Sequence, residues 1–510
     1  MTFGTFIGIF LVLALIIGIG FYSGKKVQNS GDFLTGGGKA GSWLVCGSIM
    51  GSLVSSQATI GTAQLAFHYG LAAWWFTLGS GIGCLLLALV YAKPLRRSKC
   101  ITELQIIGNE YGTLAGSLGS VLCSTGIFVS VLAQMVACTG LLTVLFPSIS
   151  ITAAAIISVL VMSVYVIFGG AWGAGMGGIL KLLLLYLASA AGMAYTLIVS
   201  NGVTGLLSGI NLTLAGSTLG MSQSLCGLSN LFTSSDVSQR FINLVARGAA
   251  KDIGSGLSLL LGVLSTQTYA QAIWSANSDQ KAKQGALLSA FLIPPIGIAG
   301  ICIGLFMRTH YITQAEADAL MALGEKIPQV PILQDTIQVF PTFLIDHLPP
   351  LFSGIVLGTL LITVIGGGAG LSLGMATILV KDIYKRFVGN NRFFGNELLS
   401  TRITIGVILF AAAIITVMVP SETINDLGFL SMGLRGAVVF FPLSCALWLR
   451  GKVDRRCIVI SIVFSPLAVL AGKLFHCSYD PLFLGMAVSI ICCGTGYVQT
   501  RLRFKRKIRR

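Results

Sequence analysis

The stretch TVIGGGAGLSLGMATILVKDIYKRF, residues 363–387, is apolar for most of its length and ends in basic residues. An apolar run this long predicts a membrane-spanning helix, and its basic end favours the cytoplasmic side of the membrane. Gly366, Gly367 and Gly368 lie inside the run, so three consecutive residues of one helix have no side chain. The stretch indicates a membrane protein and raises the question of which side chains this helix has lost.

The composition of the whole chain is that of a protein that crosses the membrane many times. Of its 510 residues, 55% are hydrophobic and 10% are charged, whereas soluble proteins carry about 25% charged residues. Because lipid offers the backbone no hydrogen-bond partners, we predict an all-α integral membrane protein with about thirteen transmembrane helices. The predicted spans are 3–23, 42–66, 71–92, 113–146, 151–168, 174–199, 252–272, 285–307, 350–381, 398–419, 427–448, 457–474 and 481–498.

The formal net charge of +16 does not indicate a surface for nucleic acid, because the basic residues gather in short loops at alternate helix ends. This positive-inside pattern predicts an N-terminus outside the cell and a cytoplasmic C-terminus, in the inner (plasma) membrane. No basic residue precedes the run 3–23, so we expect a retained helix rather than a signal peptide. We expect the basic tail 501–510 to lie on anionic lipid, and the chain to be a monomer.

No residue pattern points to an enzyme or to a cofactor. Most of the twelve cysteines lie in apolar runs, where cysteine acts as a small hydrophobe. His476 and Cys477 form the only close pair of possible metal ligands in the sequence, and no nucleophile–base–acid set occurs at membrane depth. We therefore expect no catalytic residue, no cofactor and no metal site.

Two segments on the expected outer side are long, about 200–251 and 308–349. The second contains acidic residues and prolines. It is either a lid of short helices over the outer side or an ordinary linker, and the sequence favours neither.

A polar patch interrupts the predicted span 42–66. Irregular backbone at membrane depth is tolerated only where it is buried in protein or lines a cavity. Serine and threonine could instead bond to their own helix, but the longer amides of Gln57 and Gln64 cannot be satisfied in that way. We therefore favour a broken helix beside a cavity. The patch consists of Ser55, Ser56, Gln57, Thr59, Gly61, Thr62 and Gln64.

Several stretches that occur in a fixed order resemble the solute:sodium symporter family, which includes bacterial proline, sialate and galactose carriers. Each match is weak alone, but together they extend from residue 31 to about 450. The matching stretches are GDFLTGGGKAGSW (31–43), SLVSSQATIG (52–61), YGL (69–71), TELQIIGNEYG (102–112), YVIFGGAWGA (165–174), SANSDQKAKQGALLSA (275–290) and KDIYK (381–385).

The resemblance implies a LeuT-type inverted repeat of five plus five helices, with one extra N-terminal and two extra C-terminal helices. Such folds bind substrate near the midplane, at broken helices. The family positions imply substrate contacts from Ser55, Ser56, Gln57 and Thr59 on the first core helix, and from Gln267 and Tyr269 on the sixth. The implied division is 1–40, first helix and loop; 41–200, first repeat; 201–251, outer loop; 252–450, second repeat; and 451–510, C-terminal helices and tail.

The family's sodium site is altered in this sequence. The resemblance assigns sodium-binding carbonyls to Gly51 and Val54 on the first core helix and to Thr363 on the eighth. It assigns two hydroxyl side chains to Gly366 and Gly367, where the oxygens are missing. A hard cation needs more oxygens than three carbonyls supply, so we expect the usual sodium site to be lost.

Two cations, Lys181 and Arg435, lie deep inside predicted spans, away from the span ends. Where the family usually has Thr-Asp at the start of the fifth core helix, this chain has Gly177-Gly178 followed by Lys181. Arg435 lies about eight residues into the tenth core helix. A charge at such depth often marks a transport pathway. The alternatives are that Lys181 reaches the inner interface and that Arg435 bonds to helix-end carbonyls.

The two cations suit different tasks. Arginine stays protonated and can hold a carboxylate with two parallel bonds, whereas the amine of Lys181 could take the place of the sodium ion. We predict a secondary transporter that imports a small polar solute, which bears a carboxylate, by alternating access. We expect proton coupling or uncoupled exchange rather than the usual sodium site. The alternatives are a sodium-coupled symporter with a rearranged ion site and a transport-inactive membrane sensor.

Overall fold

The computed structural model describes residues 2–24, 36–146, 148–214, 238–324, 329–384, 397–418 and 424–508, and these are almost entirely helical. Several predicted features lie outside the described residues, among them loop residues 31–35, part of the outer segment (215–237), Lys385, and Arg509 and Arg510 of the tail. The helices of the first half are α1 (Phe3–Gly24), α3 (Ser42–Leu53), α4 (Ile60–Tyr69), α5 (Trp75–Leu86), α6 (Ala92–Arg97), α7 (Glu103–Tyr111), α8 (Thr113–Leu145), α9 (Ile151–Val199), α10 (Gly202–Leu214) and α11 (Ser238–Phe241).

The second half continues the helical bundle and adds two very short strands, β1 (Ile312–Thr313) and β2 (Ile332–Leu333), which pair in parallel. Its helices are α12 (Ala249–Val263), α13 (Gln267–Ser275), α14 (Asp279–Leu292), α15 (Pro294–His310), α16 (Gln314–Ala322), α17 (Val339–His347), α18 (Pro350–Ile378), α20 (Glu397–Met418), α21 (Ile424–Arg435), α22 (Phe441–Trp448), α23 (Arg455–Leu474) and α24 (Leu482–Ile508). Short 3-10 or π turns join some of them, namely η1 (Gly36–Gly38), η2 (Gly70–Trp74), η3 (Leu87–Tyr91), η6 (Thr336–Gln338), η7 (Leu379–Tyr384) and η9 (Gly436–Phe440).

Among the described residues, nine helical stretches are long and apolar enough to cross a membrane, and three shorter apolar helices accompany them. The all-α membrane prediction is confirmed, whereas the count of thirteen spans stays a prediction. One predicted boundary is wrong, because α9 runs without interruption through residues 169–173, where a turn was expected. Glycine weakens a helix by only about 1 kcal/mol and keeps its N–H group. No proline occurs within α9, so its backbone hydrogen bonds can all form.

Two helices are broken inside the bundle. The first break separates α3 from α4, and Val54 at the end of α3 has φ −80° and ψ 88°, which is not helical. The second break separates α12 from α13, between Val263 and Gln267. All six residues from Val54 to Thr59 are buried, so the irregular backbone lies inside protein, where its polar groups can find partners.

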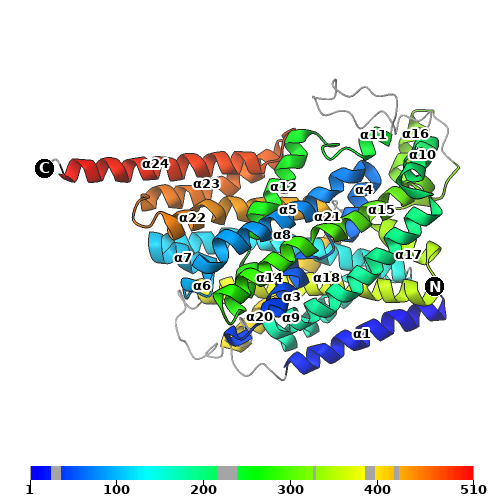
Figure 1. The fold of residues 1–510 in the computed structure, drawn as a ribbon, viewed down its shortest axis with the longest axis horizontal. Coiled ribbons are helices and arrows are strands. Elements are labelled where there is room, and N and C mark those ends of the chain that lie inside the picture. Colours follow the sequence, from blue (N-terminus) through cyan, green and yellow to red (C-terminus); the bar gives the residue numbers. More distant parts are fainter. Residues whose placement is uncertain are drawn as a thin grey trace.

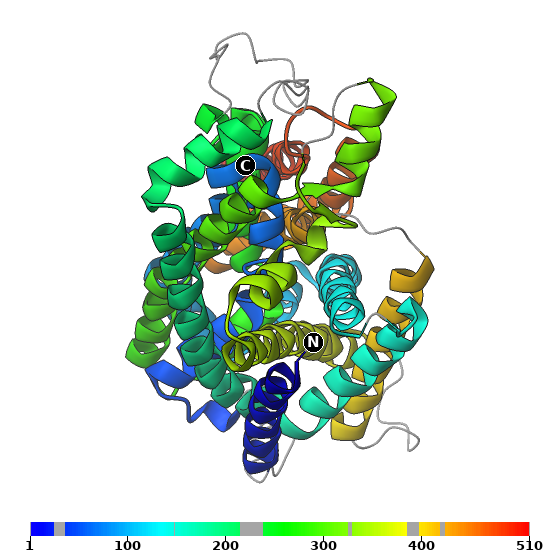
Figure 2. The same ribbon diagram turned by 90° about the vertical axis from the view of Figure 1, so that its right-hand side faces the viewer.

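Helix α18, which contains the three consecutive glycines, lies inside the bundle. It packs against α1, α3, α8 and α9, and Figure 2 shows it among these helices, with α1 on the outside. Glycines also allow α3 and α9 to touch. A β-carbon on Gly178 would lie 1.9 Å from the carbonyl oxygen of Gly47, so this contact requires glycine. The close approach brings the side chain of Lys181, one turn further along α9, toward α3.

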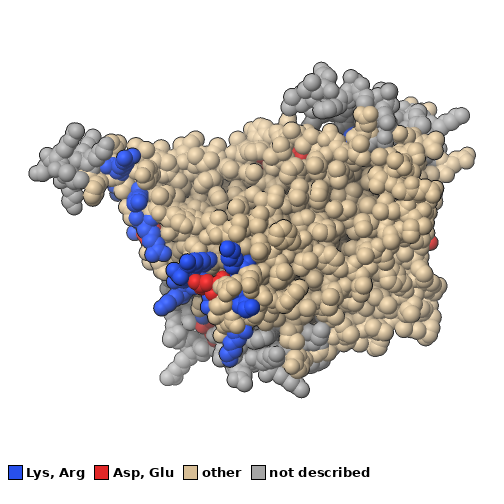
Figure 3. Space-filling model, in the orientation of Figure 1, with Lys and Arg blue, Asp and Glu red and all other residues tan. Residues whose placement is uncertain are grey.

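The two ends of the bundle differ in charge. The N-terminus and the C-terminus lie at opposite ends of the molecule (Figure 1). Lys and Arg side chains gather at the end that holds the C-terminus, and the broad middle of the visible face carries almost none (Figure 3). We call this end the basic end; it includes Arg96 and Arg97, which pair with Asp279, and Arg503, which pairs with Asp454. The opposite end, with α16 and α17, is called the lid end.

Candidate functional site

The side chain of Lys181 lies between α3 and α18. It is 3% exposed, and its Nζ donates to the carbonyl oxygen of Gly51 at 2.8 Å and to that of Thr363 at 3.2 Å. Three helices therefore meet at one ammonium group: α9 supplies the amine, and α3 and α18 supply the oxygens. Among the described contacts of Lys181, none is with Val54. The amine points into the protein and not toward a helix end, so it does not snorkel.

The glycines of α18 face this site and the break in the first core helix. A β-carbon on Gly366 would lie 3.7 Å from the oxygen of Gly51 and 3.9 Å from Nζ of Lys181, so this position faces the amine. A β-carbon on Gly367 would lie only 2.6 Å from the β-carbon of Ser55. Gly367 is thus required for the contact between α18 and the break, whereas Gly366 leaves room beside the lysine.

The break between α3 and α4 is held by Gln134 of α8, which sequence reasoning missed. Its Oε1 accepts from the backbone N–H of Ser56 at 3.1 Å and from the Ser56 hydroxyl at 2.8 Å. Its Nε2 donates to Ser55 Oγ at 3.2 Å and to Gln57 Oε1 at 3.0 Å. The sequence signal that could have pointed to Gln134 is that it is the single glutamine inside the apolar run 113–146. Thr59 bonds instead to the Ser55 carbonyl one turn back, at 3.0 Å.

Two buried amides beside the break have donors or acceptors without partners. Nε2 of Gln57 and both amide atoms of Asn425 on α21 make no hydrogen bond to the described residues. The amide of Asn425 lies against α4, since a β-carbon on Gly61 would be 2.4 Å from Asn425 Oδ1. The amide of Gln57 lies against α21, since a β-carbon on Gly428 would be 3.1 Å from Gln57 Nε2. Buried polar groups are normally satisfied, so these amides are candidates for binding a polar solute.

Aromatic rings border the same region. Phe76 of α5 and Phe429 of α21 have ring centroids 5.8 Å apart, and a β-carbon on Gly428 would lie 3.2 Å from Phe76. The arrangement offers amide hydrogen bonds next to apolar surface, which is the usual composition of a small-molecule site.

Arg435 is fully buried at a different point of the bundle. Its Nε donates to the carbonyl oxygen of Ser431, its Nη1 to Thr266 Oγ1 at 2.8 Å, and its Nη2 to the hydroxyls of Ser130 and Ser431, both at 2.9 Å. A β-carbon on Gly126 would lie 2.9 Å from Arg435 Cγ, so glycine makes space for the arginine stem. The guanidinium therefore joins α8, α21 and the second helix break.

The two predicted contacts on the sixth core helix do not join the polar patch. Gln267 faces the loop before α7: its Nε2 donates to the carbonyl oxygen of Ile101 at 2.7 Å, and its Oε1 accepts from the N–H of Glu103 at 3.1 Å. Tyr269 is buried on the side of Arg435. The structure thus brings Ser55, Ser56 and Gln57 together and leaves Gln267 outside that group.

An acidic residue lies near Arg435. Glu103 falls between the predicted spans 71–92 and 113–146, but α7 packs against α8, and the Glu103 side chain is 1% exposed. The carboxyl group of Glu103 and the guanidinium of Arg435 influence each other electrostatically. Sequence alone does not show that the loop folds back onto the bundle and buries the first acid of α7.

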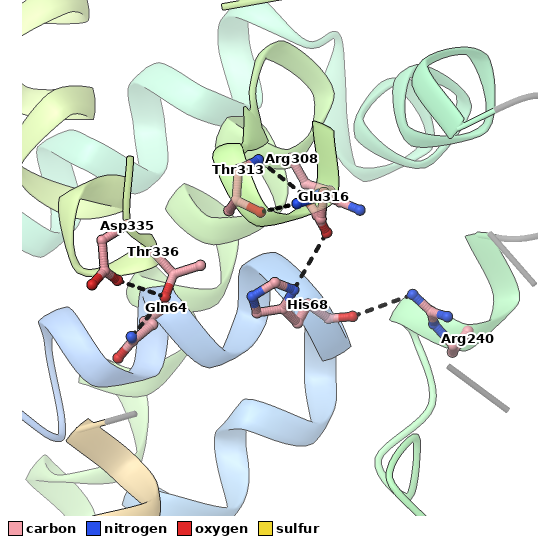
Figure 4. Close-up of polar contacts among 8 residues, drawn as sticks. All are labelled: Gln64, His68, Arg240, Arg308, Thr313, Glu316, Asp335 and Thr336. Atoms are coloured by element: carbon pink, nitrogen blue, oxygen red, sulfur yellow. Dashed lines mark hydrogen bonds and ion pairs between the residues drawn. The ribbon is translucent and has the colours of Figure 1, made fainter. Parts of the chain in front are cut away.

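The lid end is closed by polar contacts between α4 and the segment 308–349 (Figure 4). Gln64 Nε2 donates to Thr336 Oγ1 at 2.7 Å, and Gln64 Oε1 accepts from the backbone N–H of Ile424 at 3.3 Å. The amide of Gln64 therefore connects α4, the segment 308–349 and α21. The same segment contains α16, η6 and α17, which are the short helices that one interpretation of its sequence predicted.

A second set of lid contacts centres on Glu316, at the start of α16 (Figure 4). Its carboxylate accepts from Arg308 at 2.8 Å and from the backbone N–H of Thr313 at 3.0 Å, and lies 3.7 Å from His68 Nδ1. Burial alone would raise the pKa of Glu316, but the charge and hydrogen bonds of Arg308 more than offset this, and the pKa is lowered. Glu316 is therefore ionised at neutral pH.

A model of the sodium:solute symporter family matches residues 33–450. The chain belongs to the sodium:solute symporter family. It is 23% identical over 458 residues to the high affinity choline transporter 1 of Homo sapiens. The aligned region covers 87% of this chain and 73% of that protein. It is 26% identical over 199 residues to the uncharacterized symporter YwcA of Bacillus subtilis (strain 168). The aligned region covers 38% of this chain and 37% of that protein.

Two solved structures have a similar fold. A Na+-coupled sialic acid symporter in a substrate-bound outward-open state matches with a TM-score of 0.74 and 16% identity, over 98% of both chains. Mhp1, a nucleobase-cation-symport-1 family transporter, matches with a TM-score of 0.52 and 10% identity, over 93% of this chain and 96% of the other. These matches establish the LeuT-type fold, and the family membership makes the protein a secondary transporter rather than an enzyme. The residue limits of the two repeats stay a prediction.

In this member of the sodium:solute symporter family, the amine of Lys181 contacts two of the three carbonyls that the family resemblance predicted to bind the sodium ion. Those carbonyls belong to Gly51 and Thr363. The group that meets them is covalently attached to α9 and cannot diffuse away. Gly366 faces the same amine, at a position where the family resemblance predicted a hydroxyl ligand.

Proposed function

We propose that the protein is a secondary transporter of a small polar solute in which the amine of Lys181 takes the place of the coupling sodium ion. The observation that carries this proposal is the pair of hydrogen bonds from Lys181 Nζ to the carbonyls of Gly51 and Thr363. Like a bound cation, the ammonium group holds α3 against α18. Unlike a bound cation, it is present at every step of the cycle.

A sodium ion would be disfavoured at this position for two reasons. The hydroxyl oxygens expected at positions 366 and 367 are absent, and hard cations need several oxygen ligands. The second reason is repulsion, because two unit positive charges about 4 Å apart repel by about 4 kcal/mol at an effective dielectric constant near 20. That repulsion would weaken sodium binding by about three orders of magnitude, so transport should not need sodium.

Two modes of transport are compatible with a tethered amine. The solute moves either together with a proton or in exchange for a second solute molecule, without any ion. A sodium-coupled symporter with a rearranged ion site is the remaining possibility within the family. Only sodium-coupled symport should respond to a sodium gradient in an uptake measurement. A pH gradient should drive uptake in proton symport but not in solute exchange.

The predicted carboxylate on the solute depends on Arg435. Its guanidinium donates to Ser130, Ser431 and Thr266, so a carboxylate would have to displace hydroxyl partners. The buried side chain of Glu103 also lies near the guanidinium. The hydroxyl partners of Arg435 weaken the proposal of an anionic solute, which stays a prediction. Replacing Arg435 with Gln tests it, because only a carboxylate that binds the guanidinium would lose affinity selectively over a neutral analogue.

A transport-inactive sensor is the alternative of another class. It would bind solute at the same helix break without moving it. We propose that the basic end faces the cytoplasm of a plasma-membrane protein, with the N-terminus outside, because basic loops are retained on that side. Reconstitution into liposomes distinguishes the two classes: a transporter accumulates or exchanges labelled solute, and a sensor only binds it.

The substrate can be identified by its effect on the stability of the protein. A ligand that binds the folded state raises thermal stability, so purified protein can be screened against metabolites in sodium and in potassium buffer. We expect hits that raise the unfolding temperature equally in both buffers. Replacing Gln57 with Leu should abolish the shift given by a true substrate. Hits that require sodium would contradict the proposal.

A further inference from the structure

Glu103 is a buried acid at the basic end that the proposed function does not use. It is the first residue of α7, and its side chain is 1% exposed. Its Oε2 makes no hydrogen bond to the described residues. A buried carboxylate with an oxygen that accepts no hydrogen bond is costly, whereas a neutral carboxyl group is much less so. The position therefore favours the protonated form.

The segment that carries Glu103 is hydrogen-bonded to α13 and to η7. The backbone N–H of Glu103 donates to Gln267 of α13, which in turn donates to the carbonyl oxygen of Ile101. The hydroxyl of Thr102 donates to Asp382 of η7 at 2.7 Å, and Gln105 donates to the other oxygen of Asp382 at 3.0 Å. These bonds connect α7 to α13 and to η7 at the basic end.

Glu103 interacts electrostatically with Arg435, Cys123 and Tyr91, and Arg435 is the one that acts on its ionisation. Tyr269 lies near Arg435, Asp382 accepts hydrogen bonds from the neighbours Thr102 and Gln105, and Cys445 lies on α22, which packs against α7. Burial raises the pKa of Glu103 to about 8, although the positive charge of Arg435 opposes the shift. These groups come from α21 (Arg435), α8 (Cys123), η3 (Tyr91), α13 (Tyr269), η7 (Asp382) and α22 (Cys445).

We infer that Glu103 is a proton-binding site that controls the opening of the basic end. The carboxyl group carries its proton while α7 is packed against α8 and α13, and it releases the proton to water when these contacts open. Release leaves a carboxylate, which water and Arg435 stabilise. This inference rests on the proposed transport function for its role in the cycle, because opening of this end is what would deliver solute.

The direction of the pH effect follows from linkage. The closed state binds the proton up to about pH 8, whereas an exposed glutamate has an ordinary pKa of 4.5. Between these values the open state has lost its proton and the closed state has kept it, so a rise in pH favours opening. The equilibrium shifts by up to tenfold per pH unit. Above about pH 8 both states are ionised and the dependence ends.

Infrared titration of the purified full-length protein tests the proton site without any solute. The parent should show a neutral carboxyl band that disappears with a midpoint near pH 8 and is missing in Glu103→Gln. The matched control is Glu110→Gln, on the same helix, which should keep the band. If Glu103→Gln leaves the titration between pH 6 and 9 unchanged, the inference is wrong.

Thiol labelling tests the link to opening. Cys123 is fully buried, and its Sγ lies 4.0 Å from the Ser265 carbonyl oxygen, so a small thiol reagent reaches it only after local opening. The rate of modification, read at Cys123 by mass spectrometry, is compared with that in Glu103→Gln at each pH. Each rate is first divided by the rate for the same thiol in the denatured protein, because Glu103 acts on Cys123 directly in the folded protein. The ratio of parent to variant should rise with pH and level off above about 8. A constant ratio, or no labelling in either protein, overturns the gating role.

The two proposals can fail separately. If Glu103 titrates as expected but reconstituted protein moves no solute, the transport function fails and the proton site remains. If solute is transported but the carboxyl band is unaffected by Glu103→Gln, the transport function stands and the inference about Glu103 falls.

Discussion

The Nζ of Lys181 lies 2.8 Å from the carbonyl oxygen of Gly51. This contact joins the fifth core helix to the end of α3, beside the break in the first core helix. The same amine donates to Thr363 on α18 at 3.2 Å. A single side chain therefore connects three helices of a fold that has to rearrange during transport, at carbonyls that we expect to bind sodium in related proteins.

The glycines beside this contact should differ in their tolerance of a side chain. A hydroxymethyl group at position 366 has room, since its β-carbon would lie at least 3.7 Å from the nearest atoms. At position 367 the β-carbon would lie 2.6 Å from that of Ser55. We expect Gly366→Ser to unfold at about the parent temperature. Gly367→Ser should be destabilised by about 1–3 kcal/mol, as is typical of overpacking. Equal unfolding temperatures for the two variants would contradict this packing.

Replacing Gln134 with Leu should loosen the helix break. The variant removes the partners of Ser55, Ser56 and Gln57, and each buried polar group left unsatisfied costs about 1–3 kcal/mol. Hydrogen–deuterium exchange of residues 51–62 should accelerate, and the unfolding temperature should fall. Thr139→Val is the matched control on the same helix, because the Thr139 hydroxyl is buried without a hydrogen-bond partner among the described residues. A loss of stability as large in the control as in Gln134→Leu would refute this role.

The ion pair between Arg308 and Glu316 should stabilise the lid at neutral pH and not in acid. Because the pKa of Glu316 is lowered from its ordinary 4.5, the stabilisation is fully present above 4.5 and is lost as the pH falls below that value. Glu316→Gln should therefore lower the unfolding temperature at pH 7, and this effect should shrink progressively as the pH is lowered below 4.5. Asp318→Asn, an exposed acid on the same helix, should have little effect at any pH. The idea fails if the effect of Glu316→Gln does not decrease as the pH falls below 4.5.

The fold was largely predictable from the sequence because its signals are local. Apolar runs, basic loops and the ordered family stretches indicated the helical membrane architecture, and the polar residues from Ser55 to Thr59 marked a real break. The continuity of α9 was missed, since paired glycines resemble a turn in sequence but form a helix when their N–H groups are satisfied.

The site was only partly predictable, because its remaining members depend on tertiary packing. Gln134 and Asn425 are single amides in otherwise apolar helices, and only the packing of α8 and α21 around the break gives them a role. The burial of Glu103 depends on how α7 folds back onto α8. Family spacing connected Lys181 with Gly366, but no local pattern in the sequence gives the direction of a lysine side chain.

Replacing Lys181 with Met should preserve the fold and remove the coupling. The variant keeps an apolar stem of similar length and eliminates a buried charge, so the unfolding temperature should stay within a few degrees of the parent or rise. Accumulation of solute against its gradient should be lost, and exchange of solute for solute should continue. Undiminished accumulation by Lys181→Met would show that the lysine has no part in coupling.

The most direct test of the account is the sodium dependence of transport. Protein reconstituted into liposomes is supplied with the labelled solute identified by the thermal screen, in buffers that contain either sodium or an equal concentration of potassium at the same pH. If the amine of Lys181 takes the place of the ion, the initial rates should be equal in the two buffers. A steep increase of the rate with sodium concentration would contradict the central claim, because it would require a sodium site that the contacts of Lys181, Gly51 and Thr363 do not provide.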